Sequence, residues 1–139
     1  MIVFEADGVG LPQLEQRTIS RWLRGVAADY GFVVGDLHYV FCNDERILAV
    51  NREFLQHDYY TDVITFDYTV GGMLSGDIFI SVDTVRSNAE AEGVDFDNEL
   101  CRIMVHGLLH LTGQGDKTPE TKAEMTRKEN LALKSVYWL

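Results

Sequence analysis

The sequence predicts a domain of α+β or α/β class, in which helices pack on one small mixed β-sheet. Hydrophobic residues make up 46% of the 139 residues and charged residues 24%, which is typical of a globular protein. Segments with strand character alternate with segments of helical periodicity in the order β-α-β-α-β-β-α-α-α. Only Pro12 and Pro119 interrupt the chain and no linker-like stretch divides it, so residues 1–139 are expected to form a single domain.

Four elements are predicted in the first half of the chain. Residues 2–6 and 37–42 are rich in β-branched and aromatic side chains, which favour strands. Residues 45–55 follow Asn43-Asp44, a pair suited to begin a helix. A longer helix is predicted over residues 12–30, where apolar side chains recur at helical spacing: Leu14, Ile19, Trp22, Leu23, Val26 and Tyr30.

The second half is predicted to contain a β-hairpin followed by three helices. Residues 63–68 and 77–81 have strand character, and Gly71-Gly72 between them favours a turn. The helices are expected over residues 83–92 and 97–111 and from Pro119 onward, where Thr118 supplies the N-cap.

The overall charge argues against several classes of partner. The chain has 12 Lys and Arg against 22 Asp and Glu, a formal charge of −10, and so repels polyanions such as DNA at long range.

No apolar run approaches the ~20 residues that a membrane helix needs, and the first residues lack the basic start of a signal peptide. Cys42 and Cys101 lie in apolar stretches, where buried thiols are expected rather than a disulfide framework or a zinc ribbon. We therefore expect a cytoplasmic protein without a membrane partner.

One group of residues carries recognisable chemistry. His106 and His110 are four residues apart on the helix expected over residues 97–111, so both rings project from one face. Gly113 lets the chain leave the helix with positive φ, and the turn that follows can bring Asp116 to the same place. Two imidazoles and a carboxylate can hold Zn²⁺ and leave a fourth position for water. Histidines with only a structural role on so apolar a helix would each need a buried hydrogen-bond partner, which favours the metal site.

The residue after the first histidine argues against one class of enzyme. Metzincin proteases carry a glutamate at that position as the general base, in the pattern H-E-x-x-H-x-x-G-x-x-H. The residue here is Gly107, which has no side chain to accept a proton. We therefore expect no peptidase of that mechanism, and we expect the glycine to leave space beside the metal for a bulkier substrate.

The string H-G-L-L-H-L-T-G-Q-G-D, from His106 to Asp116, resembles a known hallmark, H-G-x-L-H-L-x-G-x-x-H. This hallmark belongs to the YbeY family of rRNA maturation factors, also described as single-strand-directed endoribonucleases. Residues 61–66 (T-D-V-I-T-F) and Gly76-Asp77-Ile78 are similar to two further motifs of the family, so the resemblance covers most of the chain. It implies a zinc-dependent endoribonuclease that acts in 16S rRNA 3′-end maturation and ribosome quality control, with rRNA and ribosomal components as partners.

Two positions depart from the family pattern. Asp116 stands where the family usually has a third histidine. A carboxylate still binds Zn²⁺ but lowers its Lewis acidity, and the same ligand set occurs at 2-His-1-carboxylate iron sites, so another divalent transition metal is an alternative. Leu55 aligns with an arginine of many members, and Arg52 and His57 are the candidates to replace it in orienting phosphate. The sequence assigns no general base.

Two sets of polar residues have both a functional and a structural interpretation. Asp62 and Asp77 are candidates to orient a histidine ligand or a water molecule, although turn-forming residues beside strands would have the same pattern. Arg17, Arg21 and Arg24 recur on one helix face, where they either follow a phosphate backbone or form a solvated surface.

Two other functions stay open at this point. One is a non-catalytic ribosome-assembly factor with a structural metal, and the other is a metal-dependent hydrolase of a small molecule or peptide. At a net charge of −10, an RNA substrate requires local recognition, in a cleft where a metal and a few arginines outweigh the acidic exterior. We therefore expect weak binding of naked RNA at physiological salt, and delivery of the substrate by a ribosomal or protein partner.

Overall fold

In the computed structural model, which describes residues 1–55 and 61–136, a four-stranded sheet carries helices on both faces. The sheet has the order β1-β2-β4-β3, with β1 and β3 at its edges. β1 pairs parallel to β2 and β2 parallel to β4, whereas β3 and β4 pair antiparallel. The predicted hairpin is therefore confirmed, and the sheet is mixed. The strands are β1 (Ile2–Ala6), β2 (Val33–Cys42), β3 (Val63–Asp67) and β4 (Met73–Ser81).

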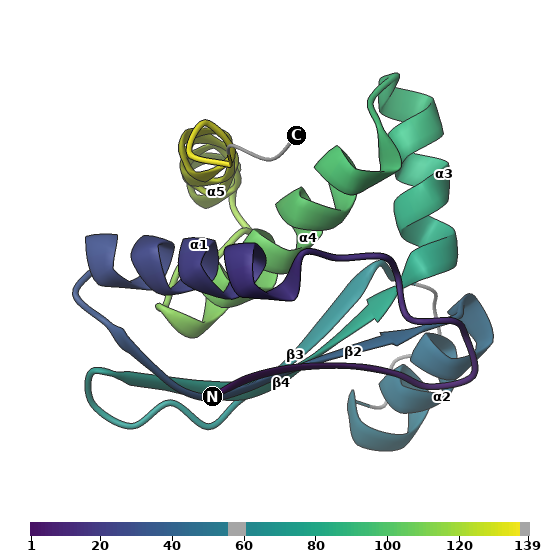
Figure 1. The fold of residues 1–139 in the computed structure, drawn as a ribbon, viewed down its shortest axis with the longest axis horizontal. Helices are drawn as coiled ribbons and strands as arrows, with labels where there is room; N and C mark the ends of the chain where they lie inside the picture. Colours follow the sequence, from purple (N-terminus) through teal and green to yellow (C-terminus); the bar gives the residue numbers. More distant parts are fainter. Residues whose placement is uncertain (56–60, 137–139) are drawn as a thin grey trace.

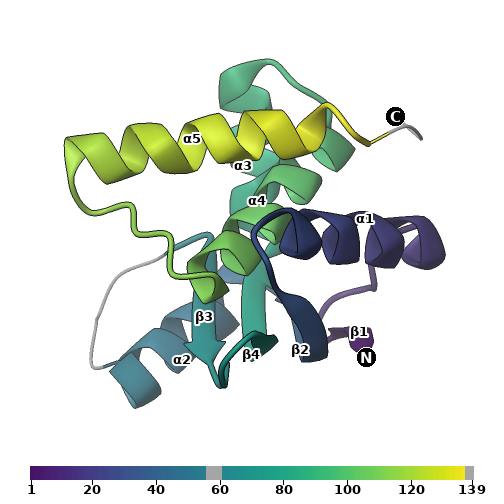
Figure 2. The same ribbon diagram turned by 90° about the vertical axis from the view of Figure 1, so that its left-hand side faces the viewer.

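Five helices in the described part of the chain complete the predicted α+β architecture. Figure 1 shows α1 and α4 on one face of the sheet and α2 on the other. In Figure 2, α5 forms an outer layer over α1 and α4. The helices are α1 (Gln16–Asp29), α2 (Asp44–Leu55), α3 (Val82–Glu92), α4 (Phe96–Leu111) and α5 (Pro119–Leu133). Among the residues that the structure describes, no helix is long and apolar enough to cross a membrane.

Three element boundaries differ from the predicted ones by four residues. β2 begins at residue 33 rather than 37, because an irregularity between Val34 and Leu37 breaks the alternation of side chains that marks a strand. β4 begins at residue 73 rather than 77, ahead of Ser75 and Gly76, which are weak strand formers. α1 begins at Gln16 rather than residue 12, although Leu14 still packs against the core.

The core explains why α4 is so apolar. Ten of its 16 residues are buried between the sheet and the outer helices, as expected for a central helix. The hydroxyl of Tyr39, on β2, donates a 2.8 Å hydrogen bond to the carbonyl of Met104 on α4. A smaller cluster under α2 contains Cys42, Ile47, Val50 and Ile64. Cys42 and Cys101 are both buried and free, as predicted.

Candidate metal centre

The end of α4 and the following loop bring the predicted ligands together. Gly113 has φ +100°, and its amide donates to the carbonyl of His110, so the helix ends and the chain turns back. The amide of Gln114 donates to the carbonyl of Leu109, while its side-chain amide donates to the carbonyl of Thr121 at the start of α5. The loop is therefore held at both ends, and Asp116 lies within it.

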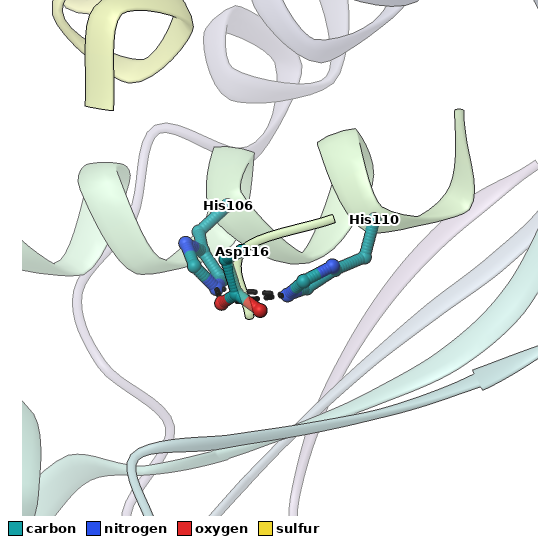
Figure 3. A group of neighbouring side chains, drawn as sticks. All are labelled: His106, His110 and Asp116. Atoms are coloured by element: carbon teal, nitrogen blue, oxygen red, sulfur yellow. Dashed lines mark hydrogen bonds and ion pairs between the residues drawn. The ribbon is translucent and has the colours of Figure 1, made fainter. Parts of the chain in front are cut away.

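Three acceptor atoms converge in front of α4. Nε2 of His106 and Nε2 of His110 lie 3.0 Å apart. Oδ2 of Asp116 lies 3.4 Å from each of these nitrogens, and Figure 3 shows the three side chains pointing toward one another. Ligands ~2.0–2.1 Å from a tetrahedral Zn²⁺ are ~3.4 Å from one another, so the observed spacings suit a small divalent cation.

The partners of the far ring nitrogens determine which atoms face the centre. Nδ1 of His110 lies 2.9 Å from the carbonyl oxygen of Gln114, and a carbonyl can only accept a hydrogen bond. Nδ1 of His106 lies 2.6 Å from Oε2 of Glu129, which accepts in the same way when ionised. Both histidines then carry their proton on Nδ1, and both Nε2 lone pairs face the Asp116 carboxylate. Three acceptors without a donor between them suit a bound cation, as at a metal site.

Glu129 is a site residue that the sequence reasoning missed. It is 7% exposed on α5, and its Oε1 accepts a 3.0 Å hydrogen bond from Nη1 of Arg102. The second guanidinium nitrogen of Arg102 donates to Oδ1 of Asn130 at 2.8 Å. A signal was present in the sequence, since Glu129 occupies a core-facing position of α5 between Met125 and Ala132, where a charge needs a partner.

The pKa values of the two histidines are shifted in opposite directions. Burial alone would lower the pKa of His106, but the hydrogen bond and charge of Glu129, together with Asp62 and Asp116, outweigh it and raise that pKa. Burial and the neighbouring His106 lower the pKa of His110, more than Asp116 and the Gln114 carbonyl raise it. His110 is therefore the more readily available neutral ligand.

Of the two aspartates considered as helpers, only Asp62 lies near the cluster. Its charge acts on both His106 and Glu99, and its backbone carbonyl accepts from the amide of Ser81. Asp77 contacts other residues: it accepts a 3.4 Å hydrogen bond from the Tyr68 hydroxyl, and its Oδ1 lies 3.9 Å from Nδ1 of His38. The structure thus does not bring Asp77 to the three ligands.

The space expected at Gly107 is absent. A Cβ at this position would lie 2.9 Å from Cγ2 and 3.0 Å from Cδ1 of Ile78, on β4. Gly107 therefore points into the sheet, and its role is to let α4 approach β4 closely. Gly76, on β4, is crowded from two elements, since a Cβ there would lie 2.5 Å from the carbonyl oxygen of Phe66 on β3 and 3.2 Å from Leu111 on α4. The glycines of two motifs thus both lie where α4 meets β4.

A groove of about 600 Å³ leads away from the ligands, between α2, β3 and the loop after α4. Leu55 lines it, as does Lys117, a basic residue that the sequence reasoning did not consider. Of the two predicted replacements for the missing arginine, Arg52 is not among the described groove residues, and His57 lies outside the described residues. The lining also includes Asn51, Thr61, Val63, Ile64, Thr65, Asp67, His110, Leu111 and Asp116.

The backbone along one edge of β3 faces this groove. Asp62 and Tyr68 form backbone hydrogen bonds to Ser81 and Ser75 on the β4 side. Because these bonds alternate along an antiparallel strand, Val63, Thr65 and Asp67 direct their amides and carbonyls away from β4. The groove therefore offers backbone donors and acceptors beside the ligands.

Comparison with known proteins gives a consistent result. The family model described as "Endoribonuclease YbeY" matches residues 9–137. Proteins of that name from Bacteroides thetaiotaomicron and Parabacteroides distasonis are 51% and 52% identical over 132 residues, which is 95% of this chain and 96% and 93% of theirs. The solution structure of a Thermotoga maritima protein, 25% identical, superposes with a TM-score of 0.64 over 98% of this chain and 89% of that one. This chain belongs to the YbeY endoribonuclease family.

Proposed function

We propose that this protein is a metal-dependent endoribonuclease that cleaves single-stranded RNA. The observation that carries the proposal is the convergence of His106, His110 and Asp116, within the hallmark of a family described as endoribonucleases. We further propose Zn²⁺ as the metal, 16S rRNA 3′-end maturation and ribosome quality control as the process, and rRNA with ribosomal components as the cytoplasmic partners. The chain acts as one domain in this proposal.

The residues around the centre have separate tasks. His106, His110 and Asp116 hold the ion, which when bound supplies an activated water and a positive charge for the phosphoryl oxygen. Glu129 and the Gln114 carbonyl keep the protons on the two Nδ1 atoms, so that both Nε2 atoms stay available.

The groove suits one extended strand of substrate. Its volume of about 600 Å³ falls within the range of ordinary ligand sites. Lys117 places one positive charge in the groove, where Leu55 supplies none, and we assign it the contact with a phosphate oxygen. The outward backbone groups of β3 can bind sugar hydroxyls or base edges of the same strand.

In this proposal, the RNA is recognised by a few groups close to the cleavage site rather than by the overall charge of the protein. Three ligands, one lysine and the strand edge act at close range, while the chain as a whole carries −10. Weak binding of naked RNA at physiological salt and delivery by a ribosomal or protein partner follow from this balance.

RNA cleavage by the purified protein and two variants tests the proposal. We expect His110→Ala to fold, to lose metal and to lose cleavage of a single-stranded RNA. His38→Ala removes a partly exposed histidine on the opposite side of the sheet and should keep both properties. A protein that binds stoichiometric zinc and does not cleave RNA, in nuclease-free preparations, would overturn the enzymatic assignment. Loss of folding together with metal in His110→Ala would instead indicate a structural metal and an assembly factor.

A further inference from the structure

A basic surface on α1 lies far from the metal ligands and takes no part in the site described above. Arg17, Arg21 and Arg24 are exposed and line a groove of about 650 Å³, together with Gln16, Ser20, Ile2 and Phe4. The groove runs between α1 and the edge strand β1. We call these three arginines the α1 arginines.

The α1 arginines differ from four other arginines because no carboxylate of the described residues forms an ion pair with them. Among residues 1–55 and 61–136, no acidic group lies within ion-pair distance of any of the three. Other arginines do face carboxylates: Arg46 with Asp7, Arg86 with Asp83, Arg102 with Glu129, and Arg127 with Glu124. In a chain of net charge −10, three unneutralised guanidinium groups in one groove form a local attractor for anions.

The spacing of the α1 arginines suits a chain of phosphates better than a single anion. The residues follow one helix face at i, i+4 and i+7, and span ~10.5 Å along the axis. That span equals about three nucleotides of a stacked strand at ~3.4 Å per nucleotide. Each guanidinium can bind a phosphate with two parallel hydrogen bonds, and Gln16 and Ser20 add neutral donors and acceptors on the same wall.

The α1 groove and the metal ligands lie toward opposite edges of the molecule. Figure 2 shows α1 and β1 on one side, and β3 on the other. Three strand spacings separate β1 from β3, or about 14 Å across the sheet. An RNA strand must therefore extend at least four or five nucleotides beyond the cleavage site to reach the α1 arginines.

We propose that the α1 arginines form a second RNA-binding surface, which holds the phosphate backbone of a single strand while another part of that strand occupies the metal centre. The inference rests on the proposed endoribonuclease function for its ligand. It predicts a length threshold, because short RNA can fill the centre without reaching α1.

Equilibrium binding of two 2′-O-methyl oligouridylates, of 4 and 12 nucleotides, tests the proposal with a readout that does not depend on ribonuclease activity. In the triple variant Arg17→Gln, Arg21→Gln, Arg24→Gln, we expect the 12-mer to bind about tenfold more weakly at 50 mM salt. The slope of log affinity against log salt should fall by about 2, since each lost phosphate contact on a single strand accounts for ~0.7. The 4-mer should bind unchanged, and the metal content should stay the same. The matching triple lysine variant should keep most of the salt slope.

A matched control distinguishes binding by the α1 arginines from an effect of the overall net charge. The variant Arg86→Gln, Lys122→Gln, Lys134→Gln also changes the net charge from −10 to −13, through exposed positions on α3 and at α5. We expect it to bind both oligonucleotides like the wild type. Equal weakening in the two triple variants, equal weakening for the 4-mer and the 12-mer, or no weakening at all would overturn the inference. Because the readout is binding rather than cleavage, absence of ribonuclease activity in the wild type would overturn the proposed function and leave this binding result intact.

Discussion

Oε2 of Glu129 lies 2.6 Å from Nδ1 of His106, while Oε1 of the same carboxylate lies 3.0 Å from Nη1 of Arg102. This contact joins α5 to the metal-facing side of α4, although the two residues are 23 positions apart in the chain. It fixes the ring of His106 and the proton on its Nδ1.

Replacing Glu129 tests that role. Glu129→Gln can still accept a hydrogen bond from His106, but it removes the negative charge. We expect the protein to fold and to bind zinc ~10–100-fold more weakly, as measured by competition with a chromophoric chelator. Glu124→Gln, on the same helix but paired with Arg127, is the control and should keep wild-type affinity. Equal zinc affinity in Glu129→Gln and wild type would show that the contact is structural only.

Gly107→Ala tests the close approach of α4 to β4. The new Cβ would lie 2.9 Å from Ile78, so we expect the free energy of unfolding to fall by ~1–3 kcal/mol. Gly25→Ala, on α1, is the matched control, because its Cβ meets no atom within 4 Å. Helix propensity alone should make that variant more stable by ~0.5–1 kcal/mol. Urea unfolding of both proteins decides the matter, and stabilisation of Gly107→Ala would show that the helix has room to accept the methyl group.

Glu99 predicts a pH dependence of stability. Burial raises the pKa of this carboxyl, with help from Asp62, Glu129 and Glu92, while Arg102 lowers it in part. Because the pKa is higher in the folded than in the unfolded state, Glu99 contributes stability below its ordinary pKa. That contribution is lost as the pH rises through the raised value.

Thermal unfolding of Glu99→Gln against pH measures this effect. The variant cannot ionise, so we expect a higher melting temperature than wild type at pH 7 to 8, and a difference that shrinks toward pH 4. Glu90→Gln changes an exposed glutamate on α3 and should show no such trend. A melting temperature for Glu99→Gln below that of wild type at pH 7 would mean that the pairing with Arg102 outweighs the cost of burial.

Replacing Lys117, which lines the groove, tests its proposed contact with a phosphate oxygen. For Lys117→Gln we expect kcat/KM on single-stranded RNA to fall about tenfold, mainly through KM, with unchanged metal content. Lys122→Gln removes an exposed lysine of α5 and should have wild-type kinetics. If the two variants are equally active, another group orients the phosphate.

The sequence was sufficient to predict the order of elements and the convergence of His106, His110 and Asp116. His106, His110 and Asp116 could be predicted to meet because four-residue spacing and a glycine turn are local features, and local geometry is readable from local sequence. The mixed sheet and the β3–β4 hairpin followed from strand patterns and one Gly-Gly turn.

What could not be predicted depends on contacts between distant residues. Glu129 meets His106 only because α5 folds back over α4, and nothing within either helix specifies that pairing. The space expected beside the metal at Gly107 is absent, because the sequence does not say which neighbour a helix face meets, and Ile78 belongs to another element. Lys117 lines the groove because of the path of the loop after α4, and the periodicity of apolar residues does not predict the path of a loop.

The proposed function depends most directly on whether the three converging acceptors hold a divalent cation. Elemental analysis of the protein as purified, beside Asp116→Ala and the control His38→Ala, measures this directly. We expect about one zinc per chain in the wild type and in His38→Ala, and a large loss in Asp116→Ala with the fold retained. Another divalent transition metal in zinc's place, at one per chain, would keep the site and change only its occupant. A wild type that purifies without metal, and takes up none on titration with Zn²⁺, would contradict the account.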